Sequence, residues 1–446
     1  MRTASLCIIL VASALTSCCP KRSNTCWFQD LQDEVLCRSG HSIQESQCHA
    51  DEEASNLLND QTSLENAMKV ALIQNKKLLS LYWELGVASA DLMQAGLYKN
   101  PIAAFSFKLH PGTGGIYDIG LLQNFLDILL KPLERKVASA EYQVRKNTIL
   151  NEILHTLTNV KKAYYSLQAA EKKRILQKEL TLVKEAEYLG AKLLRQAGNI
   201  PEIDVSVRCV DYKQSEIEYA QSELTAMQAR ENLTSILGIS DGKLDWNINL
   251  EEEPLTSYTL DPKMLIAYAI ANNLKLSSIK QQICALSAKT GINVTEMVFP
   301  EFGLGIDSEK EPEGSWFVGP QFSIAIPLFD IGQAQRLKAF SELQQLCSLY
   351  AAHMIDLKAQ SRLSIYTLTN TKKRYEEYLE GLIPETDKLL NEGTRQLNAM
   401  QIGVFDVLGL KEQTLKARVM GTETYRELQD ALAHLELLVS GYSGGI

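Results

Sequence analysis

The sequence lacks the short motifs that mark common enzymes, and it lacks the positive charge of a nucleic-acid-binding protein. No His-x-x-Glu-His, Gly-x-Ser-x-Gly, phosphate-loop or dinucleotide-binding pattern occurs, and the six histidines are scattered. The net charge of −9 offers no basic surface to neutralise phosphate, so we expect no nucleic-acid partner. Proline is scarce, at 12 of 446 residues, while 45% of the residues are hydrophobic. We therefore expect a chain with a large core, no enzymatic activity and no cofactor.

A short apolar run lies close to the N-terminus. Arg2 precedes the apolar run at residues 6–15. The last residue of this run begins the motif Leu15-Thr16-Ser17-Cys18. This run is too short to remain as a membrane-spanning helix, and it predicts a signal peptide over residues 1–17. The motif resembles the lipobox of bacterial lipoproteins, which implies a covalent lipid on Cys18. Because Cys19 rather than aspartate follows, the resemblance also implies release to the outer membrane. An ordinary signal peptide cleaved nearby is the alternative.

Residues 18–61 are polar and show no sustained period, and we interpret them as a lipidated tether. Cys26, Cys37 and Cys48 recur at intervals of eleven, which raises a metal site as a hypothesis. The same segment contains further residues of ligand type: His41, His49, Asp51, Glu52 and Glu53. No Cys-x-x-Cys pair occurs, and export favours disulfides over zinc binding, so we expect no metal. The pairing of these cysteines with one another and with Cys19 stays open.

Two helices and a β-hairpin follow the tether. Residues 62–100 carry apolar side chains at helical spacing, with a break at Asn75. Residues 101–127 alternate in polarity on both sides of a turn at residues 111–115, which predicts a hairpin.

A very long helical stretch is predicted from Lys131 to about Ala197. At about 1.5 Å per residue it spans on the order of 100 Å, a length typical of coiled helices. Gly198-Asn199-Ile200-Pro201 ends this helix and starts a return helix that runs to about Gly238, so residues 131–238 form a helical hairpin.

The same order of elements then occurs a second time, after a polar linker at residues 241–262. Matched positions lie 198 to 203 residues apart. They include residues 71–75 with 269–273, Asn100-Pro101 with Phe299-Pro300, Arg135 with Arg336, Ile203-Asp204-Val205 with Phe405-Asp406-Val407, and Gly238 with Gly441. We predict a first repeat at 62–240 and a second at 263–441, with a hairpin at 299–327, a helical hairpin at 333–440 and a tail at 442–446.

Residues 319–330 predict the last of the four strands. Phe322, Ile324 and Ile326 point to one face of this strand, and Gln321, Ser323 and Ala325 point to the other. Pro327 cannot donate a ladder hydrogen bond, so the strand should end there, before a helix that begins near Gln333. Pro327 is therefore the expected junction between strand and helix. Glu309, Lys310, Glu311 and Glu313 predict a solvated loop before this strand.

Four strands of about ten residues have the length needed to cross a bilayer when tilted. Four strands cannot close a barrel, and open strand edges are not tolerated in lipid. About eight strands make the smallest closed barrel, so the chain is expected to associate with copies of itself. Two copies would supply eight strands and three copies twelve, so the strands alone leave the number of copies open.

The combined pattern over residues 62–441 resembles the TolC-type outer-membrane efflux protein family, in particular its lipoprotein branch. The resemblance rests on four features: the Ala-Leu-x-x-Asn pattern in the helix at residues 71–75, Asn100-Pro101, the run from Gly319-Pro320 to Asp330, and the Asp-Val pairs at residues 204–205 and 406–407. It implies a mainly α-helical chain with transmembrane β-hairpins. In this family three chains form a twelve-stranded barrel in the outer membrane, continued by an α-helical periplasmic tunnel. The resemblance also implies a periplasmic adaptor and an inner-membrane transporter as partners of the homotrimer.

The resemblance further implies a periplasmic gate at the far helical turns, with Asp204 and Asp406 at the positions where the family narrows its tunnel. The structural alternative is that Asp204 only favours the positive end of its helix. The chain also departs from the family, because Gly409 stands where many members carry a second acid. Leu397 and Ile402 replace constraining polar side chains, which argues against a tightly latched gate.

The function predicted from the sequence is a passive exit duct for a tripartite efflux pump or a type I secretion system. The alternative is a non-conducting coiled-coil outer-membrane lipoprotein that acts as a structural scaffold. The hairpins favour the duct, because a scaffold has no need for four alternating strands of bilayer length.

Overall fold

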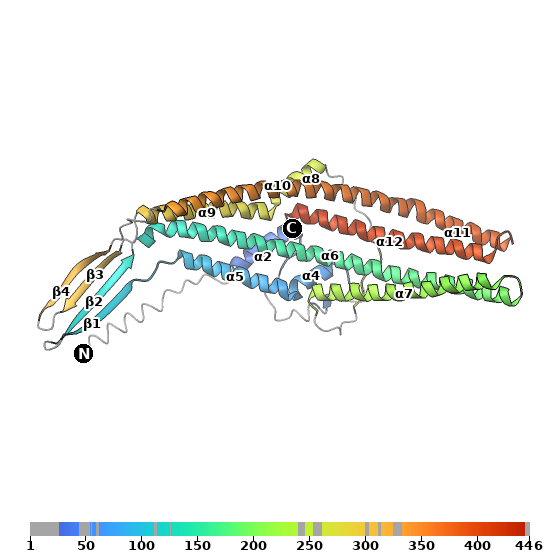
Figure 1. The fold of residues 1–446 in the computed structure, drawn as a ribbon, viewed down its shortest axis with the longest axis horizontal. Coiled ribbons are helices and arrows are strands. Elements are labelled where there is room, and N and C mark those ends of the chain that lie inside the picture. The colour runs from blue at the N-terminus through green and yellow to red at the C-terminus, as the bar shows by residue number, and fades with distance from the viewer. Residues whose placement is uncertain are drawn as a thin grey trace.

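The computed structural model describes residues 26–43, 54, 56–58, 62–110, 114–124, 126–239, 246–252, 261–298, 303–310, 314–323 and 332–441. The molecule is elongated, with a small β-sheet at one end and two helical turns at the other (Figure 1). Two of the predicted functional residues, Cys18 and Pro327, lie outside the described residues.

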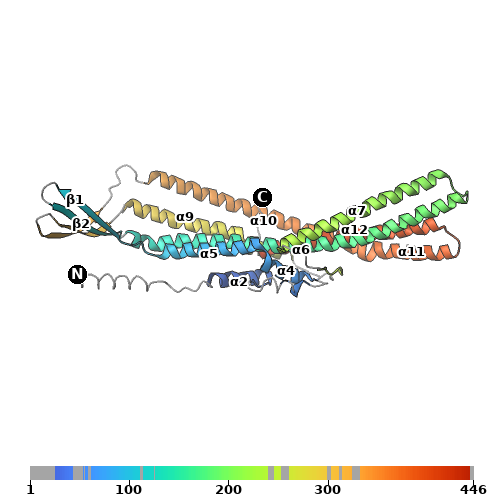
Figure 2. The same cartoon turned by 90° about the horizontal axis from the view of Figure 1, so that it is seen from below.

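The helices of the first half are α2 (Cys26–Ser39), α4 (Leu64–Gln74), α5 (Lys76–Gly96), α6 (Leu126–Gln196) and α7 (Glu202–Leu237). Those of the second half are α8 (Pro262–Asn272), α9 (Leu274–Val298), α10 (Gln333–Glu376), η1 (Glu377–Leu382), α11 (Ile383–Asn398) and α12 (Val404–Ser440). The strands are β1 (Ile102–His110), β2 (Gly114–Asn124), β3 (Gly303–Lys310) and β4 (Trp316–Ser323). Seen from two directions, the helices run lengthwise beside one another (Figure 2). Within the described part of the chain, no helix is both long and apolar enough to cross a membrane.

The four strands form one antiparallel sheet in the order β1-β2-β3-β4, so each hairpin pairs internally and the two hairpins pair through β2 and β3. Directly paired residues share a face of the sheet. Phe107 pairs with Tyr117, and Leu121 pairs with Ile306, so one face is apolar across strands. Its large exposed side chains are Phe105, Phe107, Tyr117, Ile119, Leu121, Ile306, Trp316, Val318 and Phe322.

The opposite face of the sheet is more polar. Ser106 pairs with Asp118, which pairs in turn with Glu309, and Gly120 pairs with Asp307. The Ser106 hydroxyl donates a hydrogen bond to Asp118 Oδ2 over 3.2 Å. The larger apolar residues on this face are Ile102, Ile116, Leu122 and Phe317. The alternation expected from the sequence thus gives the sheet one apolar and one mixed face.

The observed strands differ from the predicted ones at two ends. The second strand was predicted to continue to Asp127 and the long helix to begin at Lys131, but β2 ends at Asn124 and α6 begins at Leu126. Asp127 lies in the first turn of α6 and forms an ion pair with Lys99 over 3.0 Å. Its negative charge at the N-terminal end of the helix stabilises the start of α6 at Leu126. Glu309 and Lys310, predicted in a loop, belong to β3, where cross-strand pairing with β4 extends the strand.

The two repeats share their central junctions. In the first, Asn75 separates α4 from α5, and its Oδ1 accepts hydrogen bonds from the backbone N–H groups of Lys77 and Leu78. Its Nδ2 donates to Ile236 O over 2.8 Å and so ties the break to the end of α7. Gly238 closes α7 with φ +81°, and a Cβ there would lie 2.7 Å from Gln74 O.

The second junction repeats this arrangement. Asn273 separates α8 from α9 and accepts from Leu276 N over 2.9 Å. The preceding Asn272 donates to Val439 O, near the end of α12, over 3.4 Å. Gly441 closes α12 with φ +108°, and a Cβ there would lie 2.2 Å from Asn272 O. Both glycines are required by the left-handed backbone and by the close approach of a helix end.

The long arms of the two repeats differ in one respect. α6 is an uninterrupted helix of 71 residues, whereas α10 and α11 are joined through the π-helix η1. Arg135 and Arg336 lie 201 residues apart, but Ile203 and Phe405 lie 202 apart, so the second repeat holds one more residue between these points. A π turn contains one residue more than an α turn, and η1 accommodates this extra residue.

The N-terminal segment differs from its interpretation as a tether without regular structure. Residues 26–39 form the helix α2, which places Phe28, Leu31 and Val35 in the main hydrophobic cluster. This cluster also contains buried residues of α4, α5 and α6, and it lies in the middle of the molecule. The apolar spacing of three and four residues is helical, but it covers only two turns in a polar context.

Replacing Asn75 with alanine tests the first junction. We expect Asn75→Ala to lower the free energy of unfolding by about 1–2 kcal/mol, because the cap of α5 and the bond to Ile236 are both lost. Denaturant unfolding followed by helical circular dichroism measures this change. Asn232→Ala, at an exposed position of α7, is the control and should stay within about 0.5 kcal/mol of the parent.

Candidate functional site

Two helical turns lie together at the end of the molecule opposite the sheet (Figure 1). One joins α6 to α7 and the other joins α11 to α12, and their backbones make the same bonds. Gly198 N donates to Arg195 O, and Met400 N donates to Leu397 O, each over 2.9 Å. Both Gly198 and Met400 are left-handed, with φ +77° and +56°. The backbone of Met400 thus adopts a conformation that favours glycine, and this residue is 93% exposed.

Asp204 and Asp406 occupy equivalent places just past these turns. Asp204 is the third residue of α7, is exposed, and donates through its backbone N to Pro201 O over 3.3 Å. Asp406 is the third residue of α12, is exposed, and accepts through Oδ2 from Gly403 N over 2.9 Å. Asp406 therefore caps its helix directly, whereas Asp204 acts on its helix end only through its charge.

A buried carboxylate joins the two helical hairpins close to the turns. Glu187 of α6 has a side chain only 2% exposed and forms ion pairs with Lys184 over 3.2 Å and with Arg208 of α7 over 2.8 Å. Lys184 also pairs with Glu412 of α12. Two acids and two bases therefore connect α6, α7 and α12. This connection links the first repeat to the second.

The pKa values within this cluster follow from the pairing. Burial alone would raise the pKa of Glu412, but hydrogen bonds from Lys184 and Lys416 outweigh it and lower that pKa. Burial alone would lower the pKa of Lys184, yet its bonds to Glu412 and Glu187 raise it. Both groups are therefore held in their charged forms. Their contribution to stability is lost at both extremes of pH. It decreases when the pH falls through the lowered pKa of Glu412, and it decreases when the pH rises through the raised pKa of Lys184.

An aromatic contact lies beside this cluster. The Arg208 guanidinium carbon lies 5.1 Å from the centre of the Phe405 ring, on the first turn of α12. A Cβ on Gly190 would lie 3.5 Å from that ring, so the small residue leaves space for it. Arg208 thus bridges a buried acid of its own hairpin and an aromatic ring of the other. No local sequence pattern marks Glu187, Arg208 or Glu412, because their pairing joins positions far apart in the chain.

α7 carries an apolar stripe that no described residue of this chain covers. The exposed side chains recur mainly at intervals of three, four and seven residues, as on a helix that packs lengthwise. They are Ile203, Val207, Val210, Ile217, Leu224 and Met227. The buried side of α7 faces α6 through Val205, Ser222 and Ala226.

The cysteine-based metal hypothesis fits poorly with α2. Cys26 and Cys37 both lie on this helix, eleven positions apart, which corresponds to about 16 Å along its axis. One metal ion cannot bind both side chains at that separation. Cys48, His49 and the acids at residues 51–53 lie outside the described residues. Among those that the structure describes, no group of three ligand-type side chains is placed to hold a metal.

Replacing Glu187 with glutamine tests whether the buried cluster holds the hairpins together. We expect Glu187→Gln to destabilise the protein by about 3 kcal/mol, because two cations lose their shared buried partner. Thermal or denaturant unfolding measures the change. Glu179→Gln removes an exposed partner of Lys411 in the same pair of helices and should cost less than about 1 kcal/mol. Equal losses in the two variants would contradict this role for Glu187.

Comparison with known proteins gives one consistent picture. No family model matches the sequence. The cobalt-zinc-cadmium resistance protein CzcC of Cupriavidus metallidurans is 19% identical over 225 residues, which is 50% of this chain and 53% of that protein. This chain therefore aligns with only about half the length of that relative.

The solved structures cover far more of the chain. A membrane protein from Pseudomonas aeruginosa superposes with a TM-score of 0.71 at 14% identity, covering 86% of this chain and 94% of that one. The outer-membrane channel OprN gives 0.69 at 15%, covering 90% and 93%. CusC, described for its transmembrane channel formation, gives 0.68 at 15%, covering 87% and 94%. These likenesses confirm the resemblance to TolC-type proteins at the level of the fold: the chain has the fold of outer-membrane channels such as OprN.

Proposed function

We propose that three copies of this chain form an outer-membrane channel that serves as the passive exit duct of a tripartite efflux pump or a type I secretion system. The partners would be a periplasmic adaptor and an inner-membrane transporter. The fold likeness supports this proposal, since its neighbours are named as outer-membrane channels. The chain itself would carry out no chemistry.

The two-faced sheet is the observation that carries the proposal. Its apolar face exposes aromatic and branched side chains on all four strands, with no described element covering them. Its outer strands, β1 and β4, leave unpaired edges. An apolar face suits lipid, and open edges in lipid must pair with another chain. Three such sheets of four strands would close a twelve-stranded barrel with its apolar face outward.

Such a barrel would have an acidic lining. Asp118, Asp307 and Glu309 lie on the more polar face of the sheet, which would turn inward. A non-conducting scaffold would have no use for this division between the two faces.

The helices would continue the duct beyond the membrane. α6 is 71 residues long, about 100 Å, and the exposed stripe on α7 requires an apolar partner. A neighbouring copy would provide that partner and close the helices into a tunnel. The lipid expected on Cys18 and the bend expected at Pro327 belong to the same proposal, as the outer-membrane anchor and the junction between barrel and tunnel.

The gate would lie at the helical turns. Three copies of Asp204 and Asp406 would place up to six carboxylates at one end of the duct, attracting cations and repelling anions. Because Asp406 also caps α12, its replacement affects helix stability as well as charge. Asp204 accepts no such cap bond, so it is the cleaner probe of the gate.

The first prediction from this proposal concerns ion selectivity. We expect the double variant Asp204→Asn and Asp406→Asn to shift the reversal potential in planar bilayers toward lower cation preference, because the constriction loses its fixed negative charge. Glu385→Gln with Glu392→Gln removes two exposed carboxylates from the neighbouring α11 and is the matched control. An unchanged reversal potential in the Asp204 and Asp406 double variant would rule out the acidic gate.

The barrel lining is tested separately by Asp118→Asn with Asp307→Asn in the same measurement.

The second prediction concerns association. Ile217→Glu places a charge in the apolar stripe of α7, where burial against a second copy would be costly, and we expect it to shift the purified protein from trimer to monomer. Mass measurement in mild detergent reports the change. Thr225→Glu, an exposed position on α7 outside the stripe, should leave the trimer intact. A trimeric Ile217→Glu protein would show that the stripe is not at the interface.

A further inference from the structure

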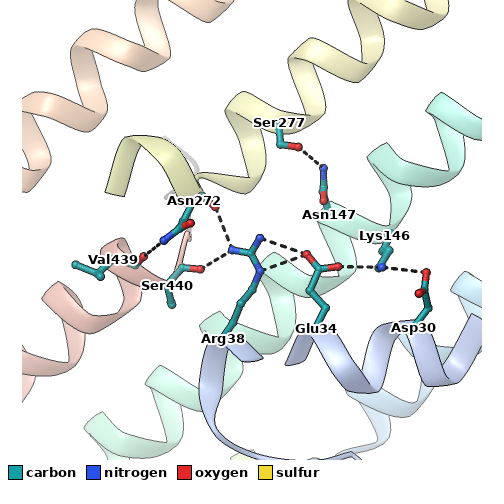
Figure 3. A network of polar contacts seen from close by, with 9 residues as sticks. All are labelled: Asp30, Glu34, Arg38, Lys146, Asn147, Asn272, Ser277, Val439 and Ser440. Atoms are coloured by element: carbon teal, nitrogen blue, oxygen red, sulfur yellow. Dashed lines mark hydrogen bonds and ion pairs between the residues drawn. The ribbon is translucent and has the colours of Figure 1, made fainter. Parts of the chain in front are cut away.

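Arg38, near the C-terminal end of α2, meets the carbonyl ends of two helices from the other half of the chain (Figure 3). Its Nη1 donates to Asn272 O over 3.1 Å and to Ser440 O over 2.8 Å. Asn272 is the last residue of α8 and Ser440 the last of α12. Carbonyls at a helix C-terminus lack intrahelical partners and carry partial negative charge. One guanidinium therefore caps both helices.

A chain of alternating charges holds Arg38 in position. Its Nε and Nη2 both donate to one oxygen, Glu34 Oε1, over 3.3 and 3.2 Å, in a charge-assisted pair that leaves Oε2 for another cation. Glu34 Oε2 lies 2.9 Å from Lys146 Nζ of α6, and Lys146 also bonds Asp30 over 3.2 Å. The Lys146 side chain is 8% exposed. Burial lowers its pKa, but the bonds and charges of Glu34 and Asp30 outweigh that effect and raise it.

The apolar side of α2 is equally committed to the body of the protein. Phe28, Leu31 and Val35 are buried in the cluster shared with α4, α5 and α6. The ring of Trp27 lies against α5, where a Cβ on Gly86 would come within 3.3 Å of it. α2 is therefore bound through burial on one side and through ion pairs at its end.

Comparing the two central junctions shows which part of this arrangement is specific. Gly238 and Gly441 close equivalent helices, and each lies against the carbonyl of a helix end. A Cβ on Gly441 would also lie 2.6 Å from Arg38 Nη1, whereas the nearest atoms to a Cβ on Gly238 belong to Gln74 and Asn75. Arg38 therefore contacts the junction of the second repeat.

We propose that α2 is an N-terminal clasp whose docking site is the paired C-terminal ends of α8 and α12, with Arg38 as the positioning residue. The clasp ties the second-repeat junction to α6 of the first repeat through Glu34 and Lys146. This inference does not depend on the proposed channel. It requires that α2 and the second-repeat junction loosen together when the guanidinium is removed.

Hydrogen exchange on the full-length protein in detergent tests the clasp. Arg38→Met keeps much of the side-chain stem and removes the charge. We expect exchange about ten- to a hundredfold faster both in residues 35–39 and at the second-repeat junction, residues 272–276 and 437–441. Arg38→Lys keeps the charge but not the fork, and should give an intermediate effect. Arg374→Met, which breaks an exposed pair with Glu427, is the control and should leave these segments unchanged.

A second pair of variants approaches the clasp from its docking site. Gly441→Ala would push against Arg38 as well as Asn272, whereas Gly238→Ala introduces similar strain at the junction that Arg38 does not reach. We expect faster exchange in residues 35–39 for Gly441→Ala only. The proposal is overturned if Arg38→Met accelerates α2 alone, or if both glycine variants release α2 equally. If either glycine variant does not fold, the Arg38 series decides the question.

Discussion

The lengthwise packing of very long helices, whose apolar faces must be covered along their whole length, is the constraint on which this structure depends. α6 alone contains 71 residues, and no compact core can cover such a length. It packs instead against α7, α9, α12 and α5 along successive parts of its surface. Helices that pack side by side still leave their ends unsatisfied. The stability of the molecule is therefore decided largely at turns, breaks and helix ends, where Asn75, Asn273 and Arg38 act.

The ends of the helices also show how far the two repeats have diverged. Their distal turns keep the same backbone bonds, yet glycine at 198 corresponds to methionine at 400. The cap of α12 is an aspartate bond that α7 does not have. The second arm contains the π-helix η1 where α6 is continuous. Equivalent architecture is thus maintained by different local means, because backbone geometry constrains a turn more strongly than side-chain identity does.

The sequence allowed much of the architecture to be predicted, because each long element repeats its apolar pattern many times. The two hairpins, the break at Asn75 and the turn at Gly198 all carry local signals, such as alternation, a capping residue or a glycine followed by a proline. The predicted start of α6 was wrong because Asp127 was interpreted as the end of a strand, whereas it stabilises the first turn of the helix. The helix α2 was missed because its apolar side is short.

The charged cluster at the distal end could not be predicted in the same way. Glu187 and Arg208 are 21 residues apart, and Lys184 and Glu412 are 228 apart, so nothing local connects them. Surface and buried charges look alike in a sequence, and only the packing of α6 against α12 determines which become buried. Asp204 and Asp406 were predicted because the family resemblance implied a gate at these positions and the internal repeat matched one to the other, which is information of a different kind from contact.

The contact between Arg38 and Ser440 also constrains the order in which the molecule can be completed. The two residues are 402 positions apart, so their bond closes nearly the whole chain into a loop. Closing a flexible loop of that length costs on the order of 5 kcal/mol in chain entropy, and that cost falls sharply once the intervening helices have formed. In a chain that emerges with its N-terminus first, α2 can pack on α4, α5 and α6 early, but Arg38 has both of its carbonyl partners only after α8 and α12 have formed. Completion of the C-terminus then becomes the event that fastens the N-terminus.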